Sequence, residues 1–155
     1  VGTTVTVYLP PALEHPARVA PESLPTAAST RALVVDDEPA LAELVAAWLT
    51  DLHMTVKTAN TPEAAMRIAA EFKPELLVSD ANLGAQIDGL ELARLLVERN
   101  PALLVVFMTG FSDRIRALQA AGVAVLAKPF TAEDLVNTLS LHLGERLRNT
   151  KSNGL

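Results

Sequence analysis

The sequence of 155 residues contains no cysteine and no long apolar run. The missing cysteine excludes disulfides, thiolate metal sites and cysteine nucleophiles, which leaves oxygen ligands and carboxylate chemistry. The apolar runs are far shorter than the roughly 20 residues that a membrane-crossing helix needs. The sequence also lacks the basic segment followed by an apolar segment that is typical of a signal peptide. We therefore expect a cytoplasmic protein without membrane contact.

A cluster of basic residues is also missing. The chain carries 13 Lys and Arg against 18 Asp and Glu, a net charge of −5. Without a basic patch it has no electrostatic footprint for gripping phosphate backbones, so nucleic acid is not an expected partner. Half of the residues are apolar, and a chain of this length can bury one full core. One domain with flanking segments is the expected organisation.

The first 29 residues differ in composition from the rest. Residues 1–10 read VGTTVTVYLP, in which apolar and polar side chains alternate as in a half-buried strand. A strand alone at a terminus has no sheet to complete, so we interpret it as the remnant of a larger domain. Prolines recur through residues 11–29, which predicts a linker. We place one domain at 30–148 and a frayed polar tail at 149–155.

Within residues 30–148, short apolar runs alternate with helical patterns, as in βαβ units wound into a parallel sheet. The runs cover residues 32–35, 54–58, 76–78, 103–108 and 123–127. Five strands and five helices in alternation predict an α/β fold, a flavodoxin-like (βα)₅ doubly wound parallel sheet with strand order 2-1-3-4-5. The run 54–58 is more polar than the others, which suits an edge strand.

Start signals predict where each helix begins. Pro39 favours the start of the first helix and Thr61 that of the second. Asp88 with Glu91, and Thr131 with Asp134, have capping-box spacing and predict the starts of the third and fifth. Ser112 is the expected cap of the fourth. The first helix should bury one apolar stripe, formed by Leu41, Leu44, Val45, Trp48, Leu49 and Leu52.

Polar side chains follow four of the predicted strands. Asp36 and Asp37 follow the first, Asp80 the third, Thr109 the fourth and Lys128 the fifth. In open parallel sheets the active crevice lies beyond the carboxyl ends of the strands. Because the expected order makes these four strands neighbours, we expect the five side chains to converge.

Three converging carboxylates repel one another and need compensating cations. Mg²⁺ is commonly held by one or two carboxylates together with substrate phosphate, and Lys128 would supply a second positive charge. Phosphoryl transfer needs an aligned nucleophile and charge compensation on the phosphoryl oxygens. Asp80 as nucleophile, Mg²⁺, Lys128 and the Thr109 hydroxyl would supply these parts.

Simpler interpretations exist for each residue alone. Asp36 and Asp37 could merely cap the helix that begins near Pro39. Asp80 could be an exposed loop acid, and Thr109 or Lys128 taken singly would more often be a surface residue. Their joint placement favours a site.

These residues resemble the receiver domains of bacterial two-component systems. The resemblance runs over about residues 31–147 and is carried, in order, by the acidic pair after the first strand, SDANL around Asp80, MTG at Thr109 and AKPF at Lys128. It implies that Asp80 accepts a phosphoryl group from phosphohistidine on a histidine kinase or a histidine phosphotransfer domain. It also implies that Thr109 and Lys128 contact that phosphoryl group.

The same resemblance implies a metal site and a backbone feature. Asp37, Asp80 and the backbone carbonyl of Asn82 would bind Mg²⁺ directly, with Mn²⁺ as a substitute, and Asp36 would act through water. The peptide bond Lys128-Pro129 would be cis. A homodimer through the fourth and fifth helices is a further expectation.

Two positions depart from the family pattern. Receivers commonly carry an aromatic switch residue three positions before the lysine, where this chain has Val125, so the usual coupling of threonine to the aromatic is in doubt. Gly84 stands where proline is frequent. The stretch GAQIDGLEL around it resembles receivers attached to sensor kinases.

Residues 1–9 carry a weaker resemblance, to the closing strand of the histidine-kinase ATP-binding domain. It implies the C-terminal receiver of a hybrid sensor kinase whose catalytic domains are absent from these 155 residues. The receiver would then catalyse only its own phosphorylation and dephosphorylation.

Two other functions remain open. A Mg²⁺-dependent phosphohydrolase with an aspartyl-phosphate intermediate usually spaces two acids as Asp-x-Asp after its first strand, whereas Asp36 and Asp37 are adjacent. A receiver-like module used only for docking would lack one of the five residues, and none is lacking.

Overall fold

The computed structural model describes residues 30–84 and 86–153, with side chains up to Gly144. The predicted strand at 1–10 and the predicted linker at 11–29 lie outside these residues. The chain divides into two compact units: Thr26–Ala132, which holds the sheet, and a second that includes Glu133–Leu155. None of the described helices combines the length and the apolar character needed to cross a membrane.

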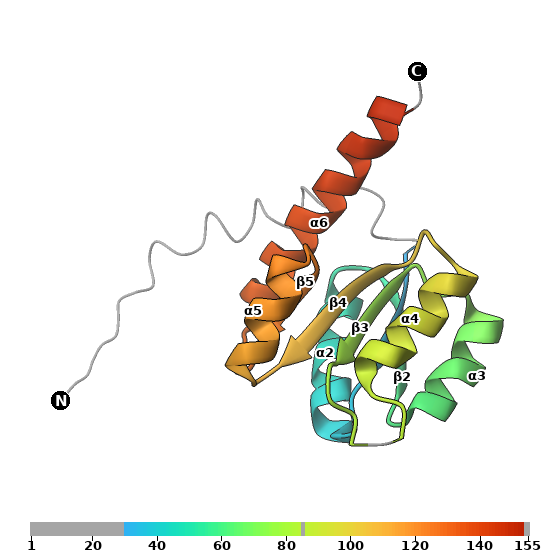
Figure 1. Ribbon diagram of the computed structural model, residues 1–155. Coiled ribbons are helices and arrows are strands. Elements are labelled where there is room, and N and C mark those ends of the chain that lie inside the picture. The colour runs from blue at the N-terminus through green and yellow to red at the C-terminus, as the bar shows by residue number, and fades with distance from the viewer. Residues whose placement is uncertain (1–29, 85, 154–155) are drawn as a thin grey trace. The chain divides into compact units, whose positions relative to one another are not determined.

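The strands form one parallel sheet, shown in Figure 1. They are β1 (Arg31–Val35), β2 (Thr55–Ala59), β3 (Leu76–Asp80), β4 (Leu104–Thr109) and β5 (Ala124–Ala127). Their order is β2-β1-β3-β4-β5, with every neighbouring pair parallel. The predicted strand order is confirmed. The more polar β2 lies at an edge, where its exposed and half-buried residues alternate.

Helices follow the strands in strict alternation. They are α2 (Pro39–Asp51), α3 (Pro62–Phe72), α4 (Gly89–Arg99), α5 (Ser112–Ala120) and, in the second unit, α6 (Ala132–Asn153). Figure 1 shows α3 and α4 side by side, and the two helices contact each other. The alternation of five strands with five helices confirms the predicted flavodoxin-like fold among the described residues.

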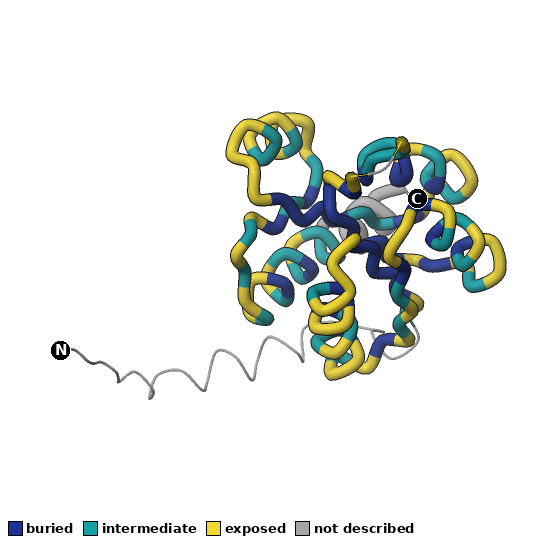
Figure 2. The backbone as a smooth tube through the Cα atoms, turned by 90° about the horizontal axis from the view of Figure 1, so that it is seen from below, coloured by how far each residue is buried: buried dark blue, intermediate teal, exposed yellow. Residues whose placement is uncertain are grey.

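The core lies along the sheet, because alternate strand residues point to opposite faces. On one face Leu33, Leu77 and Phe107 pack with the buried residues of α3 and α4. The helix α2 contacts β1 and β2, and its buried residues Ala42 and Val45 belong to no part of that cluster. We therefore assign α2 to the other face. Figure 2 shows the interior of the sheet as mostly buried and the outer sides of the helices as exposed.

Most helix starts match their sequence signals. The Thr61 hydroxyl accepts a hydrogen bond from the Ala64 N–H at 3.1 Å, and the Asp88 carboxylate accepts one from Glu91 at 2.9 Å. The prediction for Ser112 is wrong, because the N-cap of α5 is Phe111 and no side chain caps it. The turn before α5 is held instead by the preceding strand residue, as described below.

Two further expectations differ from the structure. The buried stripe of α2 is narrower than predicted: Ala42, Val45 and Leu49 are buried, whereas Leu44 is 46% exposed. A helix buries only the face that its neighbours cover, and Leu44 lies on its flank. The expected end of regular structure near residue 148 also differs, because the α6 backbone is helical to Asn153. No glycine or proline between 145 and 153 interrupts it.

Candidate functional site

The register of the sheet brings the predicted side chains together at the carboxyl ends of the strands, which form the carboxyl edge of the sheet. Asp80 pairs with Met108 at the ends of β3 and β4, and Thr109 pairs with Ala127, the residue before Lys128. Asp36 follows β1, whose last residue pairs with Ser79. The acidic residues Asp36, Asp37 and Asp80 each offer a carboxylate oxygen within 4.8 Å of the others. The structure therefore gathers the acids as expected.

Lys128 joins two of these acids. Its Nζ lies 3.2 Å from Asp36 Oδ2 and 3.2 Å from Asp80 Oδ2. The Asp36 side chain is 1% exposed and that of Asp80 is 11% exposed, so both ion pairs are largely withdrawn from water. The backbone N–H of Lys128 donates to the Thr109 carbonyl at 2.9 Å, which ties the lysine to the end of β4. The peptide bond Lys128-Pro129 is cis, as the resemblance implied.

Burial and charge act in opposite directions at these groups. Burial raises the pKa of Asp36 above its ordinary value, against the lowering effects of the Glu38 N–H and of Lys128. Burial alone would lower the pKa of Lys128, but the combined attraction of Asp36 and Asp80 outweighs it and the pKa is raised. Lys128 is therefore held in its charged form beside the acids.

Backbone donors hold the two buried acids in place. Asp36 Oδ1 accepts from the Glu38 N–H at 2.9 Å, and Asp80 Oδ1 accepts from the Asn82 N–H at 2.9 Å. Both oxygens of Asp36 are thus engaged, one by Glu38 and one by Lys128. Asp37 is exposed and forms no ion pair among residues 30–84 and 86–144.

Gly84 lies beside the exposed acid. Its φ is +62°, in the left-handed region that glycine adopts without strain. A Cβ there would meet Asp37 Oδ2 at 3.5 Å. The bare backbone at this position leaves the Asp37 carboxylate accessible from the β3–α4 loop.

Thr109 is 1% exposed. Its Oγ1 accepts a hydrogen bond from the Phe111 N–H at 3.2 Å and so forms the turn that Ser112 was expected to cap. The hydroxyl proton remains available for donation, because a hydroxyl both donates and accepts. The ring of Phe111 is 60% exposed beside it.

Three contacts near the site were not foreseen from the sequence. Asn60 donates to the Asp36 carbonyl at 3.0 Å, and Arg114 donates to the Ala81 carbonyl at 2.8 Å. A Cβ on Gly89 would lie 1.8 Å from the Asp80 carbonyl oxygen, so α4 begins against the backbone of β3. A polar residue directly after β2 was a usable signal for Asn60. No motif or spacing in the sequence predicted the contacts of Arg114 and Gly89.

The donor set fits a small hard cation. Three carboxylates within a few ångströms, balanced by one ammonium group, leave an excess of negative charge. Oxygen ligands of this kind suit Mg²⁺, which tolerates few protein carboxylates and keeps several waters. Asp37, which forms no ion pair among residues 30–84 and 86–144, and Asp80, whose side chain is 11% exposed, are the acids that a cation can reach.

Comparison with known proteins agrees with this geometry. The model of the response regulator receiver domain family matches residues 32–140. The probable transcriptional regulatory protein TcrX of Mycobacterium tuberculosis is 36% identical over 121 residues, covering 76% of this chain and 50% of that protein. The sensor histidine kinase RcsC of Salmonella typhi is 31% identical over 123 residues, covering 77% of this chain and 13% of that protein.

A solved structure shows the same fold and similar size. A response regulator receiver domain protein from Clostridium thermocellum has a TM-score of 0.65 and 25% identity, covering 76% of this chain and 98% of that one. The chain spans about half or less of the curated relatives named above. The family match includes every residue of the acidic site. The chain therefore belongs to the receiver domain family of two-component systems, whose members take a phosphoryl group from histidine kinases or phosphotransfer domains onto an aspartate.

Proposed function

We propose that Asp80 is the phosphoacceptor of this receiver domain. The observation that carries the assignment is the different exposure and charge pairing of the three acids. The Asp36 side chain is only 1% exposed, and Asp37 has no cation beside it among the described residues. Asp80 alone combines a partly exposed carboxylate with Lys128 at 3.2 Å. Its nucleophilic oxygen therefore has both access and charge compensation.

The transfer step follows from this placement. The bond between the donor imidazole nitrogen and phosphorus breaks, an Asp80 oxygen forms the new bond to phosphorus, and the imidazole keeps the electron pair and takes up a proton. Lys128 pairs with one phosphoryl oxygen, and the Thr109 hydroxyl donates to another. Phosphorylation converts the Asp80–Lys128 contact into a contact of Lys128 with the phosphoryl group.

Mg²⁺, or Mn²⁺ in its place, would be held by Asp37, Asp80 and the backbone carbonyl of Asn82, with Asp36 acting through water. When bound, the cation compensates charge on the phosphoryl oxygens. The excess of carboxylates over Lys128 supports this assignment.

The phosphodonor docks, in this proposal, beside Lys128. A hollow of about 480 Å³ lies there between α2 and the segment after β5. Trp48 and Phe130 meet edge to face in it, with ring centroids 6.2 Å apart. Leu44, which lines the same hollow, is 46% exposed. An exposed apolar surface of this kind suits an amphipathic helix bearing the donor histidine.

Comparing two phosphodonors separates an effect on docking of the donor protein from an effect on the phosphoryl-transfer chemistry. Leu44→Glu should slow phosphorylation by a phosphohistidine donor at least tenfold and leave phosphorylation by acetyl phosphate unchanged. Ala47→Glu, exposed on the same helix but outside the hollow, is the matched control. Equal slowing with both phosphodonors would contradict the docking surface.

The parent protein is, in this proposal, a cytoplasmic hybrid sensor kinase that contains this receiver. The resemblance of residues 1–9 to a kinase strand and the similarity to RcsC support it. The similarity to TcrX, a transcriptional regulatory protein by its name, supports the alternative that the receiver is part of a transcriptional regulator. The upstream coding sequence decides between them. Dimerisation through α5 and α6 and the lack of nucleic-acid binding stay predictions.

Acetyl phosphate with Mg²⁺ tests the phosphoacceptor. Intact-protein mass spectrometry should show one added phosphoryl group on the wild type and none on Asp80→Asn. Asp36→Asn is the matched control, because it removes a neighbouring acid but keeps Asp80. A phosphoryl group retained by Asp80→Asn would overturn the assignment. A phosphohydrolase with its nucleophile after β1 is disfavoured because the Asp36 side chain is 1% exposed and Asp37 has no cation beside it among the described residues.

A further inference from the structure

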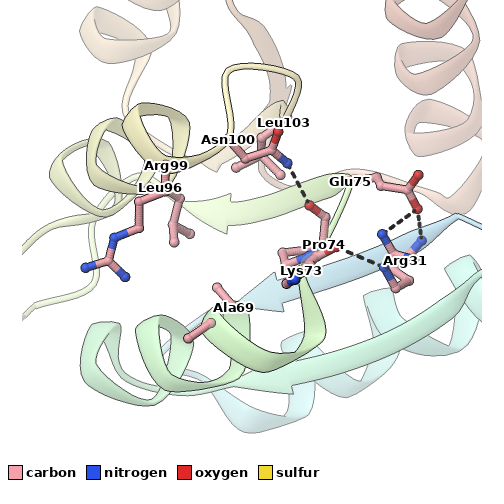
Figure 3. A pocket seen from close by; sticks show the side chains of 10 residues that line it. Arg31, Ala69, Lys73, Pro74, Glu75, Leu96, Arg99, Asn100 and Leu103 are labelled. Atoms are coloured by element: carbon pink, nitrogen blue, oxygen red, sulfur yellow. Dashed lines mark hydrogen bonds and ion pairs between the residues drawn. The ribbon is translucent and has the colours of Figure 1, made fainter.

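A second hollow lies at the amino ends of the strands, which form the amino edge of the sheet (Figure 3). We call it the amino-edge pocket. Its volume is about 520 Å³, within the range of roughly 300–1,000 Å³ common for small-molecule pockets. Arg31 at the start of β1, Glu75 before β3 and Leu103 before β4 line it, together with the ends of α3 and α4. All of these residues belong to the unit Thr26–Ala132.

The floor of this amino-edge pocket is apolar. Ala69 of α3, Leu96 of α4 and Leu103 line it and are 9%, 5% and 7% exposed. All three are members of the hydrophobic core. An apolar group of a ligand would therefore lie against a preformed apolar surface, which does not have to rearrange to receive it.

The rim is cationic. Arg31 is already engaged: its Nε donates to the Lys73 carbonyl at 2.9 Å, and its guanidinium lies 3.7 Å from Glu75. Lys73 and Arg99 are exposed and form no ion pair among residues 30–84 and 86–144. Figure 3 shows the Arg99 side chain extending from α4 into the space between α4 and α3.

These two cations also stand at helix C-termini, where positive charge is favoured by the helix dipole. That role explains the charges, but it requires neither a hollow nor an apolar floor. The carbonyls of the two residues that follow α3 are already bonded, since Lys73 O accepts from Arg31 and Pro74 O accepts from Asn100 at 3.3 Å. The groups left to meet a ligand are the unpaired cations and the floor.

We propose that the amino-edge pocket binds a small amphipathic anion. Its apolar ring or chain would pack against Ala69, Leu96 and Leu103, and its carboxylate or phosphate would pair with Lys73 and Arg99. A surplus of positive charge in this pocket contrasts with the chain's net charge of −5. The pocket is separate from Asp80, so this proposal does not depend on the assignment of Asp80 as the phosphoacceptor.

Four probes separate the two parts of the proposal in an NMR titration of the ¹⁵N-labelled protein. Naphthalene-2-carboxylate and 2-naphthyl phosphate carry both the ring and the charge, 2-naphthamide carries only the ring, and inorganic phosphate only the charge. We expect saturable amide shifts at Ala70, Lys73 and Asn100 with the first two, at a Kd on the order of 1 mM for so small a ligand. The better of the two identifies carboxylate or phosphate as the preferred head group.

Substitutions locate the binding. Arg99→Gln and Lys73→Asn should each raise the Kd about two- to fivefold, the range that exposed ion pairs support. Asparagine is chosen because Lys73 has a φ of +50°, which asparagine tolerates. Arg116→Gln, an exposed arginine of α5 outside the pocket, makes the same charge change and should leave the Kd unchanged. Ala70→Phe, which places a ring in the pocket, should abolish binding.

Several outcomes would overturn the proposal. Shifts that do not saturate, or that spare the lining amides, would remove the site. Binding of 2-naphthamide as tight as that of the carboxylate would remove the anionic part, and equally tight binding of inorganic phosphate would remove the apolar part. Equal weakening by Arg116→Gln and Arg99→Gln would reduce the effect to overall charge. Spectra of each variant without ligand check that the fold is kept.

Discussion

The two edges of the sheet carry ion pairs of opposite character. At the carboxyl edge Lys128 lies 3.2 Å from Asp36 and Asp80, whose side chains are 1% and 11% exposed. At the amino edge the Arg31 guanidinium lies 3.7 Å from Glu75, and these side chains are 44% and 51% exposed. The same strands therefore present desolvated charges at one end and hydrated charges at the other.

This difference matters because the interaction of charges depends on the water between them. Buried charges interact several times more strongly than exposed ones at equal distance. Removing one partner of a buried pair leaves an uncompensated charge, whereas removing one partner of an exposed pair leaves a hydrated one. Chemistry that depends on charge compensation is thus expected at the carboxyl edge. The amino edge is suited to reversible binding.

The largest expected effect is on the chemistry at the buried edge. Lys128→Ala should slow phosphorylation by acetyl phosphate at least about 100-fold, because the cation that pairs with the phosphoryl oxygen is lost. Arg31→Gln removes a cation of the exposed edge and should leave the rate within twofold of the wild type. Rates come from mass spectrometry of quenched samples. Similar rates for Lys128→Ala and the wild type would place the catalytic cation elsewhere.

Backbone packing beside the acids should show the next largest effect. A Cβ at Gly89 would lie 1.8 Å from the Asp80 carbonyl oxygen, so Gly89→Ala forces β3 and α4 apart. We expect a loss of about 1–3 kcal/mol in the free energy of unfolding, the usual range for overpacking. The measurement is urea unfolding followed by circular dichroism.

Gly110→Ala is the control for that measurement. The nearest atom to its Cβ would be Lys128 Cβ at 3.9 Å, an ordinary contact. Its free energy of unfolding should stay within about 0.5 kcal/mol of the wild type. Equal losses in both variants would show that the close approach at Gly89 is not the cause.

The carboxyl edge was largely predictable from the sequence. Apolar runs define the strands, and the residues after each run must meet at one edge once the strand order is known. Asp36, Asp80, Thr109 and Lys128 therefore came together from pattern alone. The family resemblance added their roles, which the sheet geometry by itself does not assign.

Other features depend on information that local patterns do not carry. The exposure of Leu44 reflects what covers α2, not its periodicity. The cap of α5 was misplaced because the Thr109 hydroxyl, rather than Ser112, accepts a backbone hydrogen bond there. The amino-edge pocket has contributions from segments far apart in the sequence, among them Arg31 and Arg99, and no motif joins them.

A smaller effect is expected from the burial of the Asp36 carboxylate. Burial raises the pKa of Asp36, so its carboxylate form opposes folding at neutral pH. Asp36→Asn should therefore have a higher Tm than the wild type at pH 7 in EDTA. The gain should shrink as the pH falls below the raised pKa of Asp36 and be lost near the ordinary pKa of the carboxyl, because the wild-type group is then neutral in both the folded and the unfolded chain. A lower Tm at pH 7 would show that its bonds to Lys128 and Glu38 outweigh the cost of burial.

The smallest effect belongs to the exposed pair. A double-mutant cycle of Arg31→Gln and Glu75→Gln should give a coupling energy below about 1 kcal/mol that fades in high salt. The same cycle for Lys128→Met and Asp36→Asn should give a larger, less salt-dependent value, because that pair is buried. Glu75→Gln also removes the carboxylate of the amino-edge pocket, so it should tighten naphthalene-2-carboxylate binding about twofold. A coupling at Arg31 as large as that at Lys128 would mean that exposure does not separate the two edges.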